Sequence, residues 1–355
     1  MSSQLICRLD ASLCYVQTSF QFQWCLKRQT RSCMKKRKSC FIWLLCILFL
    51  VTALPAVDFT DVQAASVSST FTGWKTSGGK KYYYKNGKKL TDLHKIGKYY
   101  YCFAADGTML TGWHRIHNRF RYFGKQTGRM RINQTVNGRK INSKGVWTPV
   151  VVLDPGHSAV VAGGYEPLGP GSGQMKEKDT SGTQGVATGV EEYKLNLSIG
   201  LQLRTLLQKR GFKVIMTRTN SKVALSCIDR AKVANKANAD LFISVHNNSD
   251  ATGNFTKVKG TQVMYSESDD AKLSSKKLAE ICLKNVVDTT GSENRGLLKG
   301  DSIYIIRTSK VPVALIEVGF MTNYKELDLL NSTSYQKKAA EGIYNAINEA
   351  FQEGY

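Results

Sequence analysis

The sequence predicts an α/β domain of three layers, with helices on both faces of a mostly parallel, twisted sheet, preceded by a small all-β solenoid of hairpin repeats. Apolar runs alternate with helical periodicity from about residue 149 to 353, which is typical of a parallel sheet covered by helices. Aromatic runs separated by Gly turns recur over residues 71–147. A chain of 355 residues is long enough for both parts.

The N-terminal stretch has the three parts of an export signal. A basic segment at 34–38 precedes an apolar core of 11 residues at 41–51, and small residues follow at 62–65. The core is too short for a stable transmembrane helix, so we expect a signal peptide at 34–64, a secreted protein and no stable membrane anchor after cleavage. Residues 1–33 lack periodicity, and we interpret them as an upstream extension of the reading frame.

Charge and cysteine content narrow the class of protein. The net charge of +23 is concentrated in residues 65–147, where 17 Lys and Arg face 2 acids, against 25 and 22 in residues 148–355. Such a basic segment favours polyanions, among them nucleic acid, anionic lipid and acidic wall polymers. Three cysteines follow the signal, and no Cys-x-x-Cys motif is present, which argues against a disulfide framework or a thiolate zinc site.

Residues 65–147 form the repeat region. The segment Thr72–Lys75 recurs as Thr111–His114, and Asn86-Gly87 and Asp106-Gly107 lie between aromatic runs as hairpin turns do. A unit of about 20 residues cannot bury its own face, so we expect the hairpins to stack. The region resembles cell-wall-binding repeats of the choline- and glucan-binding type, whose aromatic faces suit sugar rings or quaternary ammonium groups. The alternative is that these aromatics only hold the hairpins together.

Residues 148–355 alternate strands and helices. The first predicted strand leads to a long Gly-rich segment at 163–189, a length that is uncommon in compact domains unless it is functional. We expect strands at 150–153, 213–217, 241–245, 260–265, 302–306 and 313–316, and helices from 192 to about 210, at 226–238, 270–287 and 334–351.

Three of these strands deliver a polar residue at their carboxyl end. His157 and His246 each follow an apolar run, and Glu317 ends another. Ligands bind outside the carboxyl ends of strands in open α/β sheets, so the three groups can converge on a metal. A single strand-terminal histidine is more often a surface or hydrogen-bonded residue. The other three of the five histidines all lie in the repeat region, which favours the metal interpretation.

A resemblance to a known family is carried by motifs in order along this half of the chain. They are Asp-Pro-Gly-His at 154–157, Glu-x-x-x-Asn-Leu at 192–197, Thr-Arg at 217–218, the run 239–248, Asn-Arg-Gly at 294–296 and the run 316–323. These motifs resemble the zinc-dependent N-acetylmuramoyl-L-alanine amidases of bacterial cell walls. The resemblance implies that His157, Glu192 and His246 bind zinc and that Glu317 is catalytic.

The chain departs from that family in two places. Ser158-Ala159 follows the first histidine where the family has Gly-Gly, and the 163–189 segment is an insertion. The neighbouring Glu191 makes the glutamate ligand ambiguous by one position, and we choose Glu192 because it stands four residues before Asn196. Two histidines and one carboxylate leave one position open on zinc, as in catalytic sites.

The sequence thus predicts a secreted zinc hydrolase that cuts the amide between N-acetylmuramic acid and L-alanine. Its partners would be peptidoglycan and, as candidates on charge, anionic wall polymers; the export signal argues against nucleic acid, and we infer no obligate protein partner. Two alternatives stay open: a zinc peptidase acting within the stem peptide, and a wall-binding protein without activity.

Overall fold

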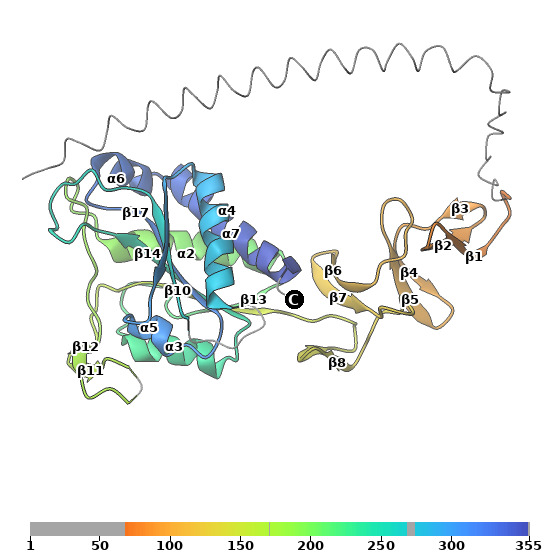
Figure 1. Cartoon of the computed structure of the whole chain (residues 1–355), viewed down its shortest axis with the longest axis horizontal. Helices are drawn as coiled ribbons and strands as arrows, with labels where there is room; N and C mark the ends of the chain where they lie inside the picture. Colours follow the sequence, from red (N-terminus) through yellow and green to blue (C-terminus); the bar gives the residue numbers. More distant parts are fainter. Residues whose placement is uncertain (1–67, 170, 268–273, 354–355) are drawn as a thin grey trace, which may run out of the picture. The chain divides into compact units, whose positions relative to one another are not determined.

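The computed structural model describes residues 68–169, 171–267 and 274–353 (Figure 1). The predicted signal peptide at 34–64 and the predicted extension at 1–33 lie outside these residues. Within the described ranges, no helix is both long and apolar enough to cross a membrane.

A six-stranded sheet forms the centre of the C-terminal half, in the order β13-β10-β14-β17-β15-β16. All neighbours in it are parallel except β15 and β17, which run antiparallel. This confirms the predicted mostly parallel sheet. The strands are β10 (Val150–Pro155), β13 (Lys213–Met216), β14 (Leu241–Asn248), β15 (Thr261–Tyr265), β16 (Asn294–Lys299) and β17 (Val313–Phe320).

Helices cover both faces of this sheet (Figure 1), as the alternation of buried residues along the strands requires. In β10, Val151 and Leu153 point into one apolar cluster and Val152 into another. The first cluster lies beneath α2 (Glu192–Lys209), α4 (Ser275–Thr290) and α7 (Thr333–Glu353), and the second beneath α3 (Cys227–Lys236) and α5 (Tyr304–Arg307). The three-layer prediction is confirmed.

The structure differs from the sequence prediction at 302–306, at 324–331 and in the insertion, where β11 (Tyr165–Pro167) and β12 (Met175–Glu177) form a hairpin that was not predicted. The segment 302–306 is not a strand: α5 starts at Tyr304, and the strand at the sheet edge is the earlier β16. A short apolar run does not distinguish a buried strand from a buried helical turn, and here the turn packs its isoleucines against α3 and β17. A further helix, α6 (Tyr324–Asn331), was not predicted; Asn323 caps it by accepting hydrogen bonds from the backbone of Lys325 and Glu326.

The N-terminal half consists of small antiparallel hairpins, as predicted. In the predicted Asn-Gly turn, Asn86 and Gly87 both have positive φ angles, 52° and 72°, as a tight hairpin turn requires. Backbone hydrogen bonds join successive units, from Met109 to Lys81 and from Met130 to Tyr100, each 2.8 Å. The strands are β1 (Gly73–Ser77), β2 (Lys80–Lys85), β3 (Lys88–Lys89), β4 (Asp92–Ile96), β5 (Tyr99–Phe103), β6 (Gly112–Ile116), β7 (Arg119–Phe123), β8 (Gln134–Val136) and β9 (Arg139–Ile141).

The last hairpins share one hydrophobic cluster with the α/β half of the chain. The ring of Phe120 in β7 lies 5.5 Å from that of Trp147, 5.3 Å from that of Phe212 and 5.9 Å from that of Phe351, between ring centroids. All four side chains are buried. The predicted domain boundary between residues 147 and 148 therefore falls inside a packed cluster.

Candidate metal centre

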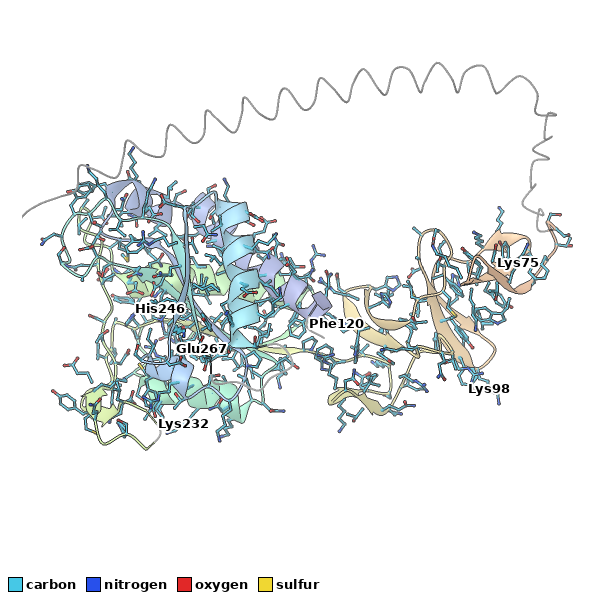
Figure 2. All side chains as sticks on the ribbon, in the orientation of Figure 1. Lys75, Lys98, Phe120, Lys232, His246 and Glu267 are labelled. Carbon is cyan, nitrogen blue, oxygen red and sulfur yellow. The ribbon has the colours of Figure 1, made fainter. Side chains whose placement is uncertain are left out.

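Three donor residues meet at the carboxyl end of the sheet. His157 follows β10, His246 lies in β14, where Figure 2 places it among the central strands, and Glu192 is the first residue of α2. Their donor atoms all lie within 4.8 Å of one another, and no other such group occurs among the described residues. Glu192 is 3.5 Å from His157 Nε2 and 3.1 Å from His246 Nδ1.

Glu192 is held by hydrogen bonds on both carboxylate oxygens. Oε1 accepts from the Asn196 side chain at 2.9 Å and from the Asn247 backbone at 3.2 Å, and Oε2 accepts from the Thr183 backbone at 3.0 Å. Burial favours the neutral acid, but the hydrogen bond with His246, the imidazole charges and the Asn196 bond outweigh it and lower the pKa of Glu192 to about 2. The residue is therefore an anion with a fixed orientation. Asn196 is the residue that singled out Glu192 over Glu191 in the sequence.

The ring of His157 is oriented by the 163–189 insertion. Its Nδ1 lies 2.8 Å from the carbonyl oxygen of Thr180, and since a carbonyl can only accept, Nδ1 carries the hydrogen. Nε2 is then free to bind a metal on the side of Glu192. Burial lowers the pKa of His157, which favours the neutral ring that a metal requires.

Two glycines allow the close approach of these side chains. A Cβ on Gly156 would lie 2.1 Å from the His246 ring, and a Cβ on Gly182 would lie 2.5 Å from Glu192 Oε2. Gly182 also has a φ of +81°, a conformation that other residues rarely adopt. Glycine is needed at both positions because any side chain there would displace a donor.

Glu317 lies beside the donors without joining their hydrogen bonds. It is paired with His246 in the register between β17 and β14, so both side chains leave the same face of the sheet. Its Oε2 is buried without a hydrogen-bond partner among the described residues. Burial raises the pKa of Glu317 to about 7, with the charge of His246 acting against the shift. Such a carboxyl group can both take up and release a proton near neutral pH.

A buried ionic network of Asp154, Arg230 and Asp179 lies beside the site. Of these three residues, the sequence motifs included only Asp154. Asp154 accepts hydrogen bonds from Thr217 at 2.6 Å and Ser244 at 2.8 Å and lies 3.8 Å from Arg230. Arg230 also pairs with Asp179 of the insertion at 2.9 Å. No spacing in the sequence marks Arg230 and Asp179, because they are 51 positions apart and belong to different elements.

A second arginine fixes the backbone that leads to His157. The Arg218 guanidinium donates to the carbonyl oxygens of Pro155 at 2.8 Å and of Gly156 and Tyr193 at 2.9 and 2.8 Å. It thereby ties the end of β10 to the start of α2. The Thr-Arg pair was part of the motif set in the sequence, but its role becomes visible only here.

The donor set fits a zinc ion. Tetrahedral zinc with ligands at about 2.0–2.1 Å places neighbouring donors about 3.3 Å apart, close to the 3.1 and 3.5 Å from Glu192 to the two histidines. Two imidazoles and one carboxylate are the donor types of catalytic zinc sites.

Comparison with known families identifies the family of the α/β half. The N-acetylmuramoyl-L-alanine amidase family matches residues 151–349, more than half of the chain. The chain belongs to this family. It is an N-acetylmuramoyl-L-alanine amidase, associated with the cell wall, and residues 90–134 match the choline-binding repeat, which indicates binding to wall polymers. The family is generally zinc-dependent.

Individual relatives agree with this assignment. The amidase is 31% identical to the uncharacterized protein YqiI of Bacillus subtilis, covering 47% of this chain and 78% of that protein. It is 29% identical to the germination-specific N-acetylmuramoyl-L-alanine amidase of the same species, covering 58% and 80%. The solved structure of the amidase Ami1 from Mycobacterium smegmatis superposes with a TM-score of 0.52 at 25% identity, covering 57% and 95% of the two chains.

Proposed function

We propose that this amidase is secreted and cleaves the bond between N-acetylmuramic acid and L-alanine with one zinc ion held by His157, Glu192 and His246. Glu317 acts as the general acid and base. The observation that carries the proposal is the convergence of three donors beside a buried carboxyl group whose Oε2 has no hydrogen-bond partner among the described residues.

Bound zinc and Glu317 would have separate roles in the hydrolysis. Bound zinc would supply a Lewis acid that polarises the amide carbonyl and lowers the pKa of water. Glu317 accepts the proton of the attacking water and delivers it to the departing amine of L-alanine, so that the same group starts and ends each cycle deprotonated. Glu192 is too acidic to share that role, because its pKa is held near 2.

The repeat region serves as the wall-targeting module of the secreted enzyme. Its net charge of +15 over residues 65–147 supports attraction to anionic polymers, which makes part of the wall affinity sensitive to salt.

Export is supported by the predicted signal peptide at 34–64, and proteomic identification of a mature N terminus after Ala64 or Ala65 in the culture medium would test it.

Metal analysis tests the ligand assignment. The purified enzyme is expected to contain one zinc per chain, to lose it with activity on chelation and to regain both with added zinc. His246→Ala removes one of three protein ligands and should lower zinc occupancy sharply. His94→Ala, in the repeat region, is the control and should keep it. Full zinc occupancy in the His246 variant would refute the site.

Product analysis tests the bond that is cut. Mass spectrometry of digested peptidoglycan should show free L-alanine amino termini and intact glycan strands. New termini within the stem peptide would instead identify a peptidase, and the absence of any released fragment would identify a wall-binding protein without activity.

A further inference from the structure

A cavity of about 330 Å³ lies between hairpins of the repeat region, far along the chain from the metal centre. We propose that it binds an anionic group, a phosphate or carboxylate attached to a sugar or polyol of a wall polymer. This proposal rests on the proposed wall-targeting role of the repeats and names the ligand chemistry and its site. The residues that carry it are Trp74, Lys81, Tyr101, Met109 and Arg129.

The cavity is built from three successive units. β1 and β2 contribute Trp74, Lys75 and Lys81, β5 contributes Tyr101, and Arg129 comes from the segment after β7. The backbone hydrogen bonds between units fix their spacing, with Met109 donating to the carbonyl oxygen of Lys81 itself. The site therefore exists only when the hairpins are stacked, and it is not a property of any single repeat.

The walls of the cavity are positively charged and lack a counter-ion from the protein. Lys75, Lys81 and Arg129 line the cavity, and no acidic residue does. The register of β1 and β2 places the Lys81 side chain on the same face as Trp74 and the Lys75 side chain on the other face, so Lys81 and Arg129 are the cationic side chains available to a ligand. In the part of the chain that the structure describes, no carboxylate oxygen lies within 4.0 Å of the Lys75, Lys81 or Arg129 cationic groups. The two acids of the repeat region are engaged elsewhere, Asp92 with His117 at 2.7 Å and Asp106 with Lys80 at 3.7 Å.

The same cavity offers an aromatic surface beside these charges. The indole of Trp74 is 42% exposed, while one side of it packs on the buried Tyr101 ring at 4.9 Å between centroids. The Arg129 guanidinium lies 3.9 Å from the centroid of the Tyr99 ring, and this contact holds it over the ring. An exposed ring face suits the apolar face of a sugar, and guanidinium N–H donors suit phosphate or carboxylate oxygens.

These charges argue against a quaternary ammonium ligand in this cavity. Recognition of such a cation depends on the negative faces of aromatic rings. Two positive side chains at one cavity oppose a third positive charge at the same place. An anion instead meets donors of charge-assisted hydrogen bonds.

Binding of the full-length enzyme to purified cell walls tests the site against general charge attraction. Lys81→Gln/Arg129→Gln removes the two charges that face the cavity, and Lys98→Gln/Lys144→Gln removes two exposed charges outside it, so both variants have the same net charge. Figure 2 shows Lys98 on the repeat hairpins. We expect about tenfold or greater loss of wall affinity for the first variant, and about twofold or less for the second.

Equal losses in the two double variants would overturn the proposal, because they would show diffuse attraction without a site. Wall binding absent already in the unmodified enzyme would instead refute the proposed targeting role. Neither result depends on the bond that the enzyme cuts.

The source of the anion is resolved by the wall preparation. Loss of binding after hydrofluoric acid has removed phosphodiester polymers identifies a phosphate ligand. Loss only after extraction of uronic acid polymers identifies a carboxylate ligand. Affinity that survives both treatments, or release of the bound enzyme by choline chloride at constant ionic strength, would overturn the proposal.

Discussion

At the scale of single residues, the two glutamates of the site have pKa values that are shifted in opposite directions. Both are buried, yet the pKa of Glu192 falls to about 2 and that of Glu317 rises to about 7. The difference arises because Glu192 lies against the two imidazoles and accepts hydrogen bonds from Asn196, Asn247 and Thr183, whereas Oε2 of Glu317 accepts none among the described residues. These opposite shifts support the proposed roles of Glu192 as a metal ligand and of Glu317 as the general acid and base.

Glutamine substitutions should separate these two roles. Glu317→Gln keeps the shape of the side chain but cannot accept a proton, so turnover should fall by about two to four orders of magnitude with zinc still bound. Glu192→Gln replaces an anionic ligand with a neutral one and should lower zinc affinity and activity together. Steady-state kinetics and metal analysis on the same preparations measure both. Zinc loss in the Glu317 variant alone would exchange the two assignments.

Gly182 should be intolerant of even a methyl group. Gly182→Ala forces a residue with a side chain to a φ of +81° and places its Cβ 2.5 Å from Glu192 Oε2. We expect zinc affinity, measured by competition with a chromophoric chelator, to fall by about tenfold or more, as for other changes to groups that orient metal ligands. Gly173→Ala, in the same insertion but with open space around it, is the control and should bind zinc normally.

At the scale of elements, the 163–189 insertion positions residues of the metal centre through hydrogen bonds and an ion pair. Its Thr180 carbonyl orients His157, its Thr183 backbone both donates to the Glu192 side chain and accepts from the Glu192 backbone, and its Asp179 pairs with Arg230 of α3. The hairpin of β11 (Tyr165–Pro167) and β12 (Met175–Glu177) is closed by a Glu166–Lys176 ion pair at 2.7 Å. The segment that departs from the family pattern thus supplies contacts to two of the three proposed ligands.

The network that joins β10 to α3 should make stability depend on acid pH. Burial would raise the pKa of Asp154, but Arg230 and the Thr217 and Ser244 hydroxyls lower it below its usual range. A carboxylate with a lowered folded pKa stabilises the fold above its unfolded pKa of about 3.9, and this stabilisation is lost as the pH falls through the folded value.

Asp154→Asn should therefore reduce the free energy of unfolding by about 3 kcal/mol at pH 7, because it leaves part of the Arg230 charge uncompensated. Urea unfolding of enzyme and variant from pH 7 to pH 2 measures the difference. We expect the gap to be constant from pH 7 to about pH 5 and to narrow below about pH 4. A gap that widens in acid would contradict the assigned direction of the pKa.

At the scale of the whole described chain, the repeat hairpins and the α/β half are not independent bodies joined by a bare linker. Phe120 and Trp147 complete the cluster of Phe212 and Phe351, and Arg115 of β6 donates to the Tyr344 hydroxyl of α7. A chain that begins at residue 148 would expose the faces of Phe212 and Phe351. A fragment meant to isolate the catalytic half should therefore retain β6 to β9.

Phe120→Ala tests this junction. Removing a buried ring that contacts three others should lower the free energy of unfolding of the α/β half by about 3–5 kcal/mol. Phe255→Ala, whose ring is 52% exposed and stacked on Tyr324, should cost only about 1 kcal/mol. Thermal unfolding followed by near-ultraviolet circular dichroism measures both. Equal effects of the two substitutions would indicate that the junction contributes no stability.

The sequence by itself determined the fold class, and it predicted the donor residues that the structure brings together. Apolar runs that end in His157, His246 and Glu317 are local patterns, and periodicity along one strand or helix depends only on neighbouring residues. The helix that begins at Glu192 could be placed for the same reason, and Asn196 four residues on was enough to select it over Glu191. Hairpin turns such as Asn86-Gly87 could be predicted in the same way from the residue types at the turn.

Only the tertiary structure decided how distant segments meet. Asp179 and Arg230, the Thr180 carbonyl behind His157, and the cavity between Lys81 and Arg129 join positions with no shared local pattern. The segment 302–306 became a helical turn because packing against α3 and β17 outweighed an ambiguous apolar run. Burial energy depends on the partner surface that the fold brings near, and that surface is absent from any short stretch of sequence.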